Sequence, residues 1–238
     1  VSAEQFVDEA LGDDHGPVRT ALEAMTAGER GWAPFQARAT KTILQHIGSP
    51  EPTATLVAAG TGSGKTKAVY LPALAHLSSF PAGEAWTKML ALYPRNELLK
   101  DQLQAAIKEL RLLRDSTGVA LTIGAFFGDT LFKEPGSRDR SWKEKNGQRV
   151  CPFLRCPSCD ADLYWFNDDG VGGLTCSTCT DSVRSDELLL GRVQQQNTPP
   201  DVLLTTVETL NRQLGNDYAR ELFGAGRQPG RRPRLLLL

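Results

Sequence analysis

The sequence has no apolar run that approaches the roughly 20 residues a membrane-spanning helix requires. Its amino-terminal end lacks the basic and then apolar pattern of a secretory signal peptide. It also lacks an internal repeat and any low-complexity tract. We therefore expect a cytoplasmic globular protein without membrane contact, and a composition of 40% hydrophobic and 23% charged residues agrees with that class.

The chain has almost no net charge, −1 at pH 7. This balance neither indicates nor excludes nucleic-acid binding, because binding proteins often confine their basic residues to one face. Basic residues do cluster at 133–155 and again at 227–234. Solvated loops explain either cluster, taken alone, at least as well as phosphate contacts do.

The 238 residues suffice for one sizeable domain, or for one domain that carries a smaller insertion. Two short helical patterns occupy the first 30 residues, and a third begins at Pro34. Further on, apolar patterns typical of strands alternate with patterns typical of helices. Strands are expected at 55–59, 89–93, 119–127, 202–205 and 235–238, and helices at 66–77, 97–114 and 207–214. This order predicts an α/β fold with a mostly parallel sheet and helices on both faces.

A glycine-rich turn lies between the first expected strand and the helix that follows it. Its sequence, Ala59–Thr66, is Ala-Gly-Thr-Gly-Ser-Gly-Lys-Thr. Glycines let backbone N–H groups curl around phosphate oxygens, and the helix amino terminus adds partial positive charge. Lys65 would reach the β- and γ-phosphates, and the Thr66 hydroxyl would hold Mg²⁺. The predicted catalytic residues are therefore Lys65 and Thr66, and the predicted nucleotide-binding residues are Gly60, Thr61, Gly62, Ser63, Gly64, Lys65 and Thr66. A purely structural turn is the alternative, because Ala59 replaces the first glycine of the strict pattern.

The same turn resembles motif I of superfamily 2 helicases, the DEAD/DEAH-box class, in which alanine commonly replaces the first glycine. Phe35-Gln36 lies where that class has its adenine-sensing glutamine. The resemblance implies a RecA-like domain that binds ATP with Mg²⁺ and acts on nucleic acid. An ordinary surface position on a helix is the alternative for Gln36.

Three further segments resemble motifs of this class that lie near nucleic acid. Residues 91–102 resemble motif Ia, residues 128–130 the Gly-Asp after the third strand, and residues 200–210 the segment before motif II. A helix start with free N–H groups is also a plausible phosphate-binding corner on physical grounds. The candidate nucleic-acid contacts are Pro94, Arg95, Asn96, Gly128, Asp129, Thr205 and Thr206. The alternatives are a helix cap for Asn96, a surface charge for Arg95 and a threonine-capped helix after a buried strand.

All five cysteines lie between residues 151 and 179. An odd number in close pairs favours metal ligation in a reducing cytosol over a disulfide framework. Two C-x2-C pairs, separated by 16 residues, predict a tetrahedral zinc site with the ligands Cys156, Cys159, Cys176 and Cys179. Reduced unligated cysteines and an iron–sulfur cluster are the alternatives. Cys151 could replace one ligand, but a spare thiol is the simpler interpretation because zinc needs only four.

The cysteine pairs lie in a polar segment that interrupts the strand–helix alternation. We expect a zinc-ribbon hairpin with strands near 163–166 and 171–175, and turns at Asp168–Gly170 and Gly172–Gly173. A segment of this length without a sheet of its own would depend on bound metal for order. The expected organisation is an N-terminal helical extension at 1–30, the first part of the RecA-like domain at 31–128, the zinc module at 129–199 and the continuation of the domain at 200–238.

These features predict the first motor domain of an ATP-dependent helicase or translocase. Large bacterial helicases associated with phage defence or DNA modification resemble this arrangement. The resemblance implies DNA as partner, with RNA as the other possibility, a second RecA-like lobe in the same polypeptide, and other subunits of a defence system. Motif II should follow Leu238. We therefore expect a fragment that hydrolyses ATP negligibly alone.

Two other functions fit part of the sequence. One is a P-loop NTPase of another kind, such as a small-molecule kinase, which would leave the motif Ia segment without a role. The other is a zinc-ribbon adaptor that binds nucleic acid and has a degenerate motor lobe. The intact Lys65-Thr66 pair argues against the adaptor.

Overall fold

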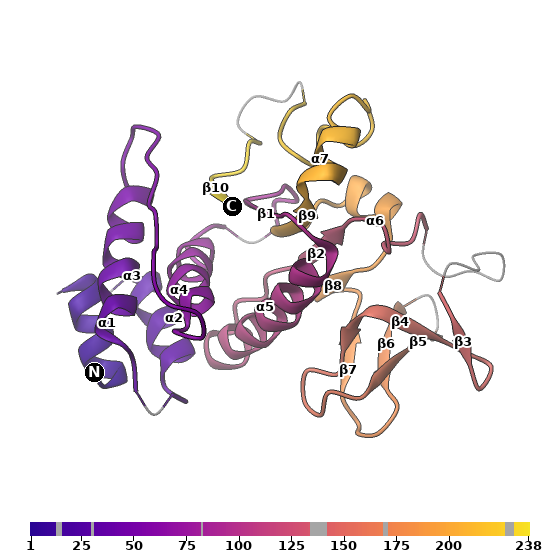
Figure 1. The fold of residues 1–238 in the computed structure, drawn as a ribbon, viewed down its shortest axis with the longest axis horizontal. Coiled ribbons are helices and arrows are strands. Elements are labelled where there is room, and N and C mark those ends of the chain that lie inside the picture. The colour runs from indigo at the N-terminus through magenta and orange to yellow at the C-terminus, as the bar shows by residue number, and fades with distance from the viewer. Residues whose placement is uncertain (13–15, 30, 82, 134–141, 169–170, 227–230) are drawn as a thin grey trace. The chain divides into compact units, whose positions relative to one another are not determined.

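The computed structural model describes residues 1–12, 16–29, 31–81, 83–133, 142–168, 171–226 and 231–238. The chain divides into two compact units (Figure 1). The first comprises Val1–Ala82 and Glu109–Ala120, and the second comprises Gly83–Lys108 and Leu121–Leu238. None of the helices in the described residues is both long enough and apolar enough to cross a membrane.

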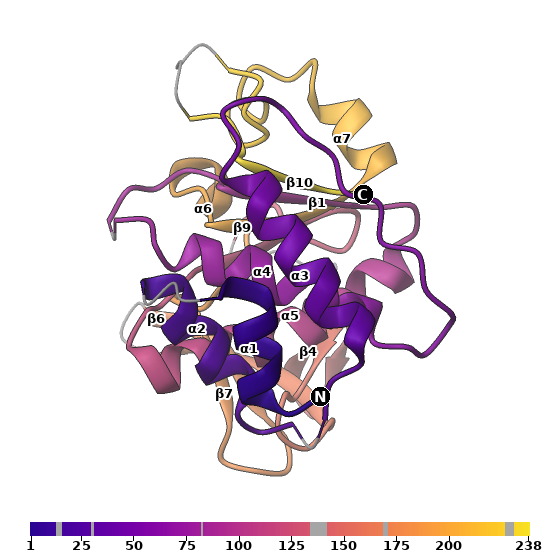
Figure 2. The same ribbon diagram turned by 90° about the vertical axis from the view of Figure 1, so that its left-hand side faces the viewer.

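The first unit is helical (Figure 2). Its helices are α1 (Ala3–Leu11), α2 (Pro17–Thr26), α3 (Pro34–Ile47), α4 (Lys65–Leu77) and the end of α5 (Asn96–Thr117). Proline begins α2 and α3, where the absent N–H is not needed and the fixed φ suits the helix. Helix α4 packs against both α2 and α3, and the Phe6 and Trp32 rings stack at 4.7 Å in the core. The three helical patterns expected before residue 48 are confirmed.

The strand expected at 55–59 is absent. The described residues 51–60 form an extended segment without strand pairing, and the Leu56 side chain is 93% exposed. A β-ladder needs a neighbouring backbone to accept and donate its hydrogen bonds. Because no described strand pairs with this segment, its apolar pattern alone does not make it a strand.

The second unit contains a five-stranded parallel sheet flanked by helices, in the order β10-β1-β9-β2-β8. The strands are β1 (Met89–Tyr93), β2 (Ile123–Phe126), β8 (Leu188–Leu189), β9 (Val202–Thr206) and β10 (Leu235–Leu237). Helices α6 (Arg192–Asn197) and α7 (Val207–Gln213) follow β8 and β9, and the beginning of α5 follows β1. The expected α/β fold with a parallel sheet is therefore confirmed.

A second sheet lies in the inserted segment and is antiparallel, in the order β3-β4-β5-β6-β7. Its strands are β3 (Glu144–Lys145), β4 (Gln148–Arg155), β5 (Asp162–Asp168), β6 (Val171–Cys176) and β7 (Ser182–Arg184). The expectation of a segment without a sheet of its own was wrong. Hydrogen-bonded hairpins order this segment, and Asn146 and Gly147, both with positive φ, form the two-residue turn of the first hairpin.

The two expected strands of the cysteine hairpin are confirmed as β5 and β6. Gly172 and Gly173, however, lie inside β6 instead of in a turn. A Cβ at Gly172 would collide with the Trp165 indole, and one at Gly173 would meet the Val183 carbonyl at 2.7 Å. Glycine is needed here because neighbouring groups approach the strand closely. The turn expected at Asp168–Gly170 includes residues 169–170, which lie outside the described residues.

Asp201 joins the starts of three parallel strands. Its carboxylate accepts hydrogen bonds from the Thr122 N–H (2.8 Å) and hydroxyl (2.9 Å) before β2. It also forms an ion pair with Lys88, whose side chain is only 4% exposed, before β1. The Asp201 carbonyl accepts from the backbone N–H groups of Lys88 and Met89, each at 2.9 Å. One residue thereby fixes the relative register of β1, β9 and β2.

We expect Asp201→Ala to lower the free energy of unfolding by about 3–5 kcal/mol, because it leaves the buried Lys88 ammonium without its carboxylate. Urea denaturation of the full chain measures the change. Asp186→Ala is the control, since this exposed carboxylate pairs, among the described residues, with exposed Arg184; we expect a change of about 0.5 kcal/mol or less. Equal effects of the two substitutions would contradict the structural role of Asp201.

Candidate functional site

The glycine-rich loop of residues 59–64 leads directly into the first turn of α4. Gly62 and Gly64 have φ of +72° and +85°, a region that glycine adopts without the steric cost of a Cβ. Gly64 then caps α4, so that Lys65 and Thr66 form its first turn. The Lys65 ammonium folds back over the loop and donates to the carbonyls of Ala59 and Gly60, each at 2.7 Å. The loop therefore places the amino terminus of α4 and the Lys65 ammonium close to one another.

Gln36 fixes this loop from outside. Its amide nitrogen donates to the Gly64 carbonyl at 3.1 Å, and its amide oxygen accepts from the Ala33 N–H at 2.8 Å. Gln36 is buried, only 6% exposed. Gln36 therefore contacts the loop and also caps the start of α3. The neighbouring Phe35 is half-buried.

A second anchor of the loop is Lys67, which sequence reasoning did not identify. Its ammonium pairs with Glu29, lies 3.7 Å from a Glu109 carboxylate oxygen and sits 5.6 Å from the centre of the Trp32 indole. Burial raises the pKa of Glu109, and the Lys67 charge opposes that rise. Three side chains from other segments thus hold the first turn of α4.

The candidate nucleic-acid residues lie at the carboxyl ends of parallel strands in the second unit. Pro94 and Arg95 are exposed after β1, and Asn96 is the first residue of α5, one position later than a cap. Gly128 is exposed just beyond β2, and Asp129 is half-buried. Parallel strands present their carboxyl ends at one sheet edge, where α/β proteins commonly bind ligands.

Thr205 and Thr206 lie at the same edge but use their hydroxyls within the chain. Thr205, fully buried, donates to the Phe126 carbonyl at 2.6 Å. Thr206 caps α7, and its hydroxyl accepts from the Thr209 N–H at 3.2 Å. Both threonines therefore shape the edge through internal hydrogen bonds.

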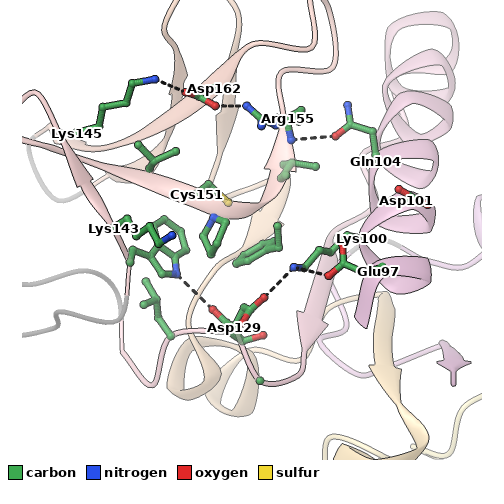
Figure 3. A pocket seen from close by; sticks show the side chains of 18 of the residues that line it. Glu97, Lys100, Asp101, Gln104, Asp129, Lys143, Lys145, Cys151, Arg155 and Asp162 are labelled. Atoms are coloured by element: carbon green, nitrogen blue, oxygen red, sulfur yellow. Dashed lines mark hydrogen bonds and ion pairs between the residues drawn. The ribbon is translucent and has the colours of Figure 1, made fainter. Parts of the chain in front are cut away.

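A groove of about 1190 Å³ opens beside this edge (Figure 3). Its walls are the first turns of α5 on one side and strands β3 and β4 on the other, with residues 128–132 as the floor. Lys100 joins the first wall to the floor, since its ammonium pairs with both Glu97 (3.0 Å) and Asp129 (3.1 Å). The basic and acidic residues of the lining nearly balance: Lys100, Lys143, Lys145, Arg155 and Arg192 against Glu97, Asp101, Asp129, Glu144, Asp160 and Asp162.

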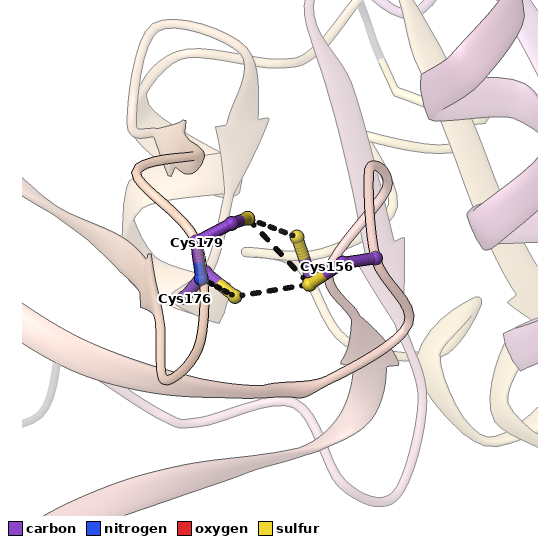
Figure 4. A group of neighbouring side chains, drawn as sticks. Cys156, Cys176 and Cys179 are labelled. Atoms are coloured by element: carbon purple, nitrogen blue, oxygen red, sulfur yellow. Dashed lines mark hydrogen bonds between the residues drawn. The ribbon is translucent and has the colours of Figure 1, made fainter.

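The four cysteines of the two C-x2-C pairs converge, and their sulfur atoms all lie within 4.8 Å of one another (Figure 4). The Sγ–Sγ distances are 3.6 Å for Cys156–Cys179, 3.4 Å for Cys159–Cys176 and 3.5 Å for Cys159–Cys179. A tetrahedron with metal–sulfur bonds of about 2.3 Å has edges of about 3.8 Å, so the donor set fits zinc. Cys151 lies in β4, outside this group.

The surroundings of the cluster favour a thiolate at one position. A hydrogen bond from the backbone N–H of Cys179 is the main cause that lowers the pKa of Cys176 to about 6. Burial acts in the opposite direction, and the backbone N–H of Thr178 lowers the pKa further. Burial raises the pKa of Cys151 to about 12, which keeps that thiol protonated and inert. Thiolates are the form of cysteine that ligates metals. Burial raises the pKa of Cys156 to about 12 as well, so among these cysteines the electrostatics favour a thiolate at Cys176, and it is the convergence of the four sulfur atoms that separates the cluster from Cys151.

The geometry of loop and edge can be compared with known families. A family model for the DEAD/DEAH box helicase matches residues 33–134. The matched stretch includes the phosphate loop, Gln36 and the Gly128-Asp129 pair, and it is less than half of the chain. It supports membership of the helicase superfamily, whose members bind ATP with Mg²⁺ and act on nucleic acid. The curated proteins compared with the chain include no match.

We expect Gly64→Ala to destabilise the first unit by about 1–2 kcal/mol, the cost of a left-handed conformation for a residue with Cβ. The added Cβ would also lie 2.5 Å from the Gln36 amide nitrogen. Gly60→Ala is the control, because its Cβ would meet nothing within 4 Å. Chemical denaturation measures both variants, and a Gly60→Ala effect as large as that of Gly64→Ala would refute the assigned strain.

Proposed function

We propose that this chain is the ATP-binding part of a nucleic-acid motor, a helicase or translocase that acts on DNA. The single observation that carries the proposal is the glycine-rich loop at the start of α4. Gly62 and Gly64 have positive φ there, and the Lys65 ammonium lies against the loop backbone. The family match over the same residues supports this function. The sequence of Tyr93–Gln102 favours DNA over RNA through its resemblance to bacterial defence-associated helicases.

ATP occupies the loop in this proposal. Phosphate oxygens replace the carbonyls of Ala59 and Gly60 as acceptors for the Lys65 ammonium. The Thr66 hydroxyl, half-buried in the first turn of α4, is the residue that would hold Mg²⁺, which neutralises phosphate charge. Residues 60–64 supply backbone N–H groups, while Phe35 and Gln36 lie on the α3 side of the loop, where an adenine would be sensed.

The nucleic acid runs along the carboxyl edge of the parallel sheet. Pro94, Arg95, Asn96 and Gly128 are exposed there, so that they can meet the sugar–phosphate backbone directly. Asp129, Thr205 and Thr206 position the edge through the contacts with Lys100, Phe126 and Thr209. Such contacts bind the backbone without reading sequence.

The cysteine cluster binds structural zinc through Cys156, Cys159, Cys176 and Cys179. Support comes from the sulfur–sulfur distances and from the two knuckles that begin and end the β5–β6 hairpin. A closed set of four thiolates leaves no position for a substrate, so the metal has a structural and not a catalytic role.

The proposal also includes the organisation of the chain into an N-terminal helical extension at 1–30, RecA-like segments at 31–128 and 200–238, and a zinc module at 129–199. Its partner is a second RecA-like lobe in the same polypeptide. Its setting is a cytoplasmic defence system.

We predict that Lys65→Ala weakens ATP·Mg²⁺ binding about tenfold to one-hundredfold, the value of a charge-assisted hydrogen bond of about 1.5–3 kcal/mol. Titration of the full chain with a fluorescent ATP analogue measures the affinity. Lys41→Ala, which removes an exposed lysine of α3, should leave the affinity unchanged. An affinity for ATP that is the same in Lys65→Ala and wild type would contradict the assigned cradle and favour the adaptor function.

We predict about one zinc per chain, lost in Cys159→Ser and retained in Cys151→Ser. Elemental analysis of protein purified under reducing conditions measures zinc and iron together. Loss of metal should also expose the β5–β6 hairpin to proteolysis, since metal-binding free energy contributes to the folding of small modules. Iron in place of zinc, or equal metal in the two variants, would count against this site.

A further inference from the structure

The groove beside α5 contains a partly buried cation without a carboxylate partner among the described residues. Lys100, Lys145 and Arg155 each form an ion pair with a carboxylate in the lining. Lys143 forms none in the described part of the chain, but it is exposed and water can solvate it. Arg192, the first residue of α6, is only partly exposed and has no such pair within the residues described.

The immediate contacts of Arg192 satisfy only part of its guanidinium. Nη2 donates to the Phe127 carbonyl at 2.7 Å and more weakly to that of Gly128 at 3.4 Å. The guanidinium carbon lies 5.3 Å from the centre of the Phe126 ring. Nε is buried without a hydrogen-bond partner among the described residues, and Nη1 has no described partner there either. Nη1 remains as a donor for a ligand.

A second positive charge, that of Arg212, acts on Arg192. Arginine stays protonated at any pH the protein meets, so its charge must be compensated when water is partly removed. Burial lowers the pKa of Arg192, and the positive charge of Arg212 on α7 lowers it further. Arg212 itself is 66% exposed and lies 3.5 Å from Glu208. Arg192 therefore keeps a positive charge that no described carboxylate pairs with, beside a second cation, and such a place suits an anion.

The position of Arg192 identifies the class of anion. Its Nη2 contacts the carbonyls just beyond β2, at the sheet edge where Gly128 is exposed. The groove that it lines, about 1190 Å³, greatly exceeds the size of a phosphate ion. Phe132 in the same lining is 66% exposed and offers a ring for base stacking. A chain of phosphates with bases fits these features better than a free anion.

We propose that Arg192, assisted by Arg212, binds a phosphate of the nucleic-acid strand as it enters the groove between α5 and the inserted module. The inference rests on the proposed function, because it names a further contact of the same strand. The planar guanidinium fork suits phosphate oxygens, and contacts of this kind position the strand without reading its sequence.

The test is the salt dependence of single-stranded DNA binding by the full chain, measured by fluorescence anisotropy with labelled oligothymidine. Each lost phosphate contact lowers the magnitude of the slope of log K against log salt by about 0.7. We expect Arg192→Gln and Arg212→Gln each to show this change, with about fivefold weaker binding at 0.1 M salt. Arg184→Gln, an exposed arginine of β7 paired with Asp186, is the matched control and should keep the wild-type slope.

Thermal unfolding of each variant separates effects on binding from effects on folding. Arg192→Lys is a second variant at this position, which keeps the positive charge and loses the planar guanidinium. If Arg192→Gln fails to fold, Arg212→Gln on its exposed site and Arg192→Lys still decide the matter. Wild-type slopes in the two Gln variants, or wild-type affinity in Arg192→Lys, would overturn the proposed contact while leaving the proposed function intact. Wild-type protein that binds no single strand at 50 mM salt would remove both.

Inorganic phosphate, titrated by calorimetry, distinguishes the two sources of the anion. Wild-type protein that binds phosphate through Arg192, with an unchanged DNA slope in Arg192→Gln, would overturn the nucleic-acid assignment in favour of a free-anion site. Negligible heat on addition of phosphate, together with a reduced salt-dependence slope for DNA binding by Arg192→Gln, supports a contact between Arg192 and the nucleic-acid strand.

Discussion

The register of the parallel sheet depends on Asp201. Its carboxylate binds Thr122, which precedes β2, and the Lys88 ammonium, which precedes β1. Its carbonyl accepts hydrogen bonds from the N–H groups of Lys88 and Met89 at the start of β1. Because strands in a parallel sheet all run the same way, fixing their starts also fixes where they end. The exposed groups of Asn96 and Gly128 reach one edge for this reason, and they follow strands that are separated in the chain. A slip of one residue would exchange the side chains that these strands present to the two faces of the sheet.

Local chemistry made much of this fold predictable. The strand Met89–Tyr93 and the helices after Pro34 and Lys65 lie where apolar periodicity, proline and glycine place them. Segments whose structure depends on a partner were not predictable in the same way. Residues 55–59 have a strand-like composition but no described strand pairs with them, and Gly172 lies inside a strand because of the Trp165 ring beside it. Composition records the residue's own preference, while a ladder or a close ring contact depends on distant residues.

The candidate sites divide along the same line. A phosphate loop and paired cysteines carry their chemistry in consecutive residues, so spacing alone indicates them. The contacts of Lys67 with Glu109, and of Arg192 with Phe127, join residues far apart in the chain. Nothing near Arg192 in the sequence marks it as different from other charged positions. Its role emerges only when the chain leaves the inserted sheet, pairs as β8 with β2 and places the next residues beside the Phe127 carbonyl.

The phosphate loop shows why such distant contacts matter for chemistry. A loop with three glycines is free to adopt the left-handed angles that a phosphate cradle needs, but the same freedom makes its ordering costly. Gln36 holds the Gly64 carbonyl, and Glu29 and Glu109 hold Lys67 in the first turn of α4. These contacts order the loop within the fold itself, so that less ordering remains when phosphate binds. Glycine therefore supplies the shape of the cradle, and residues outside the loop supply its rigidity.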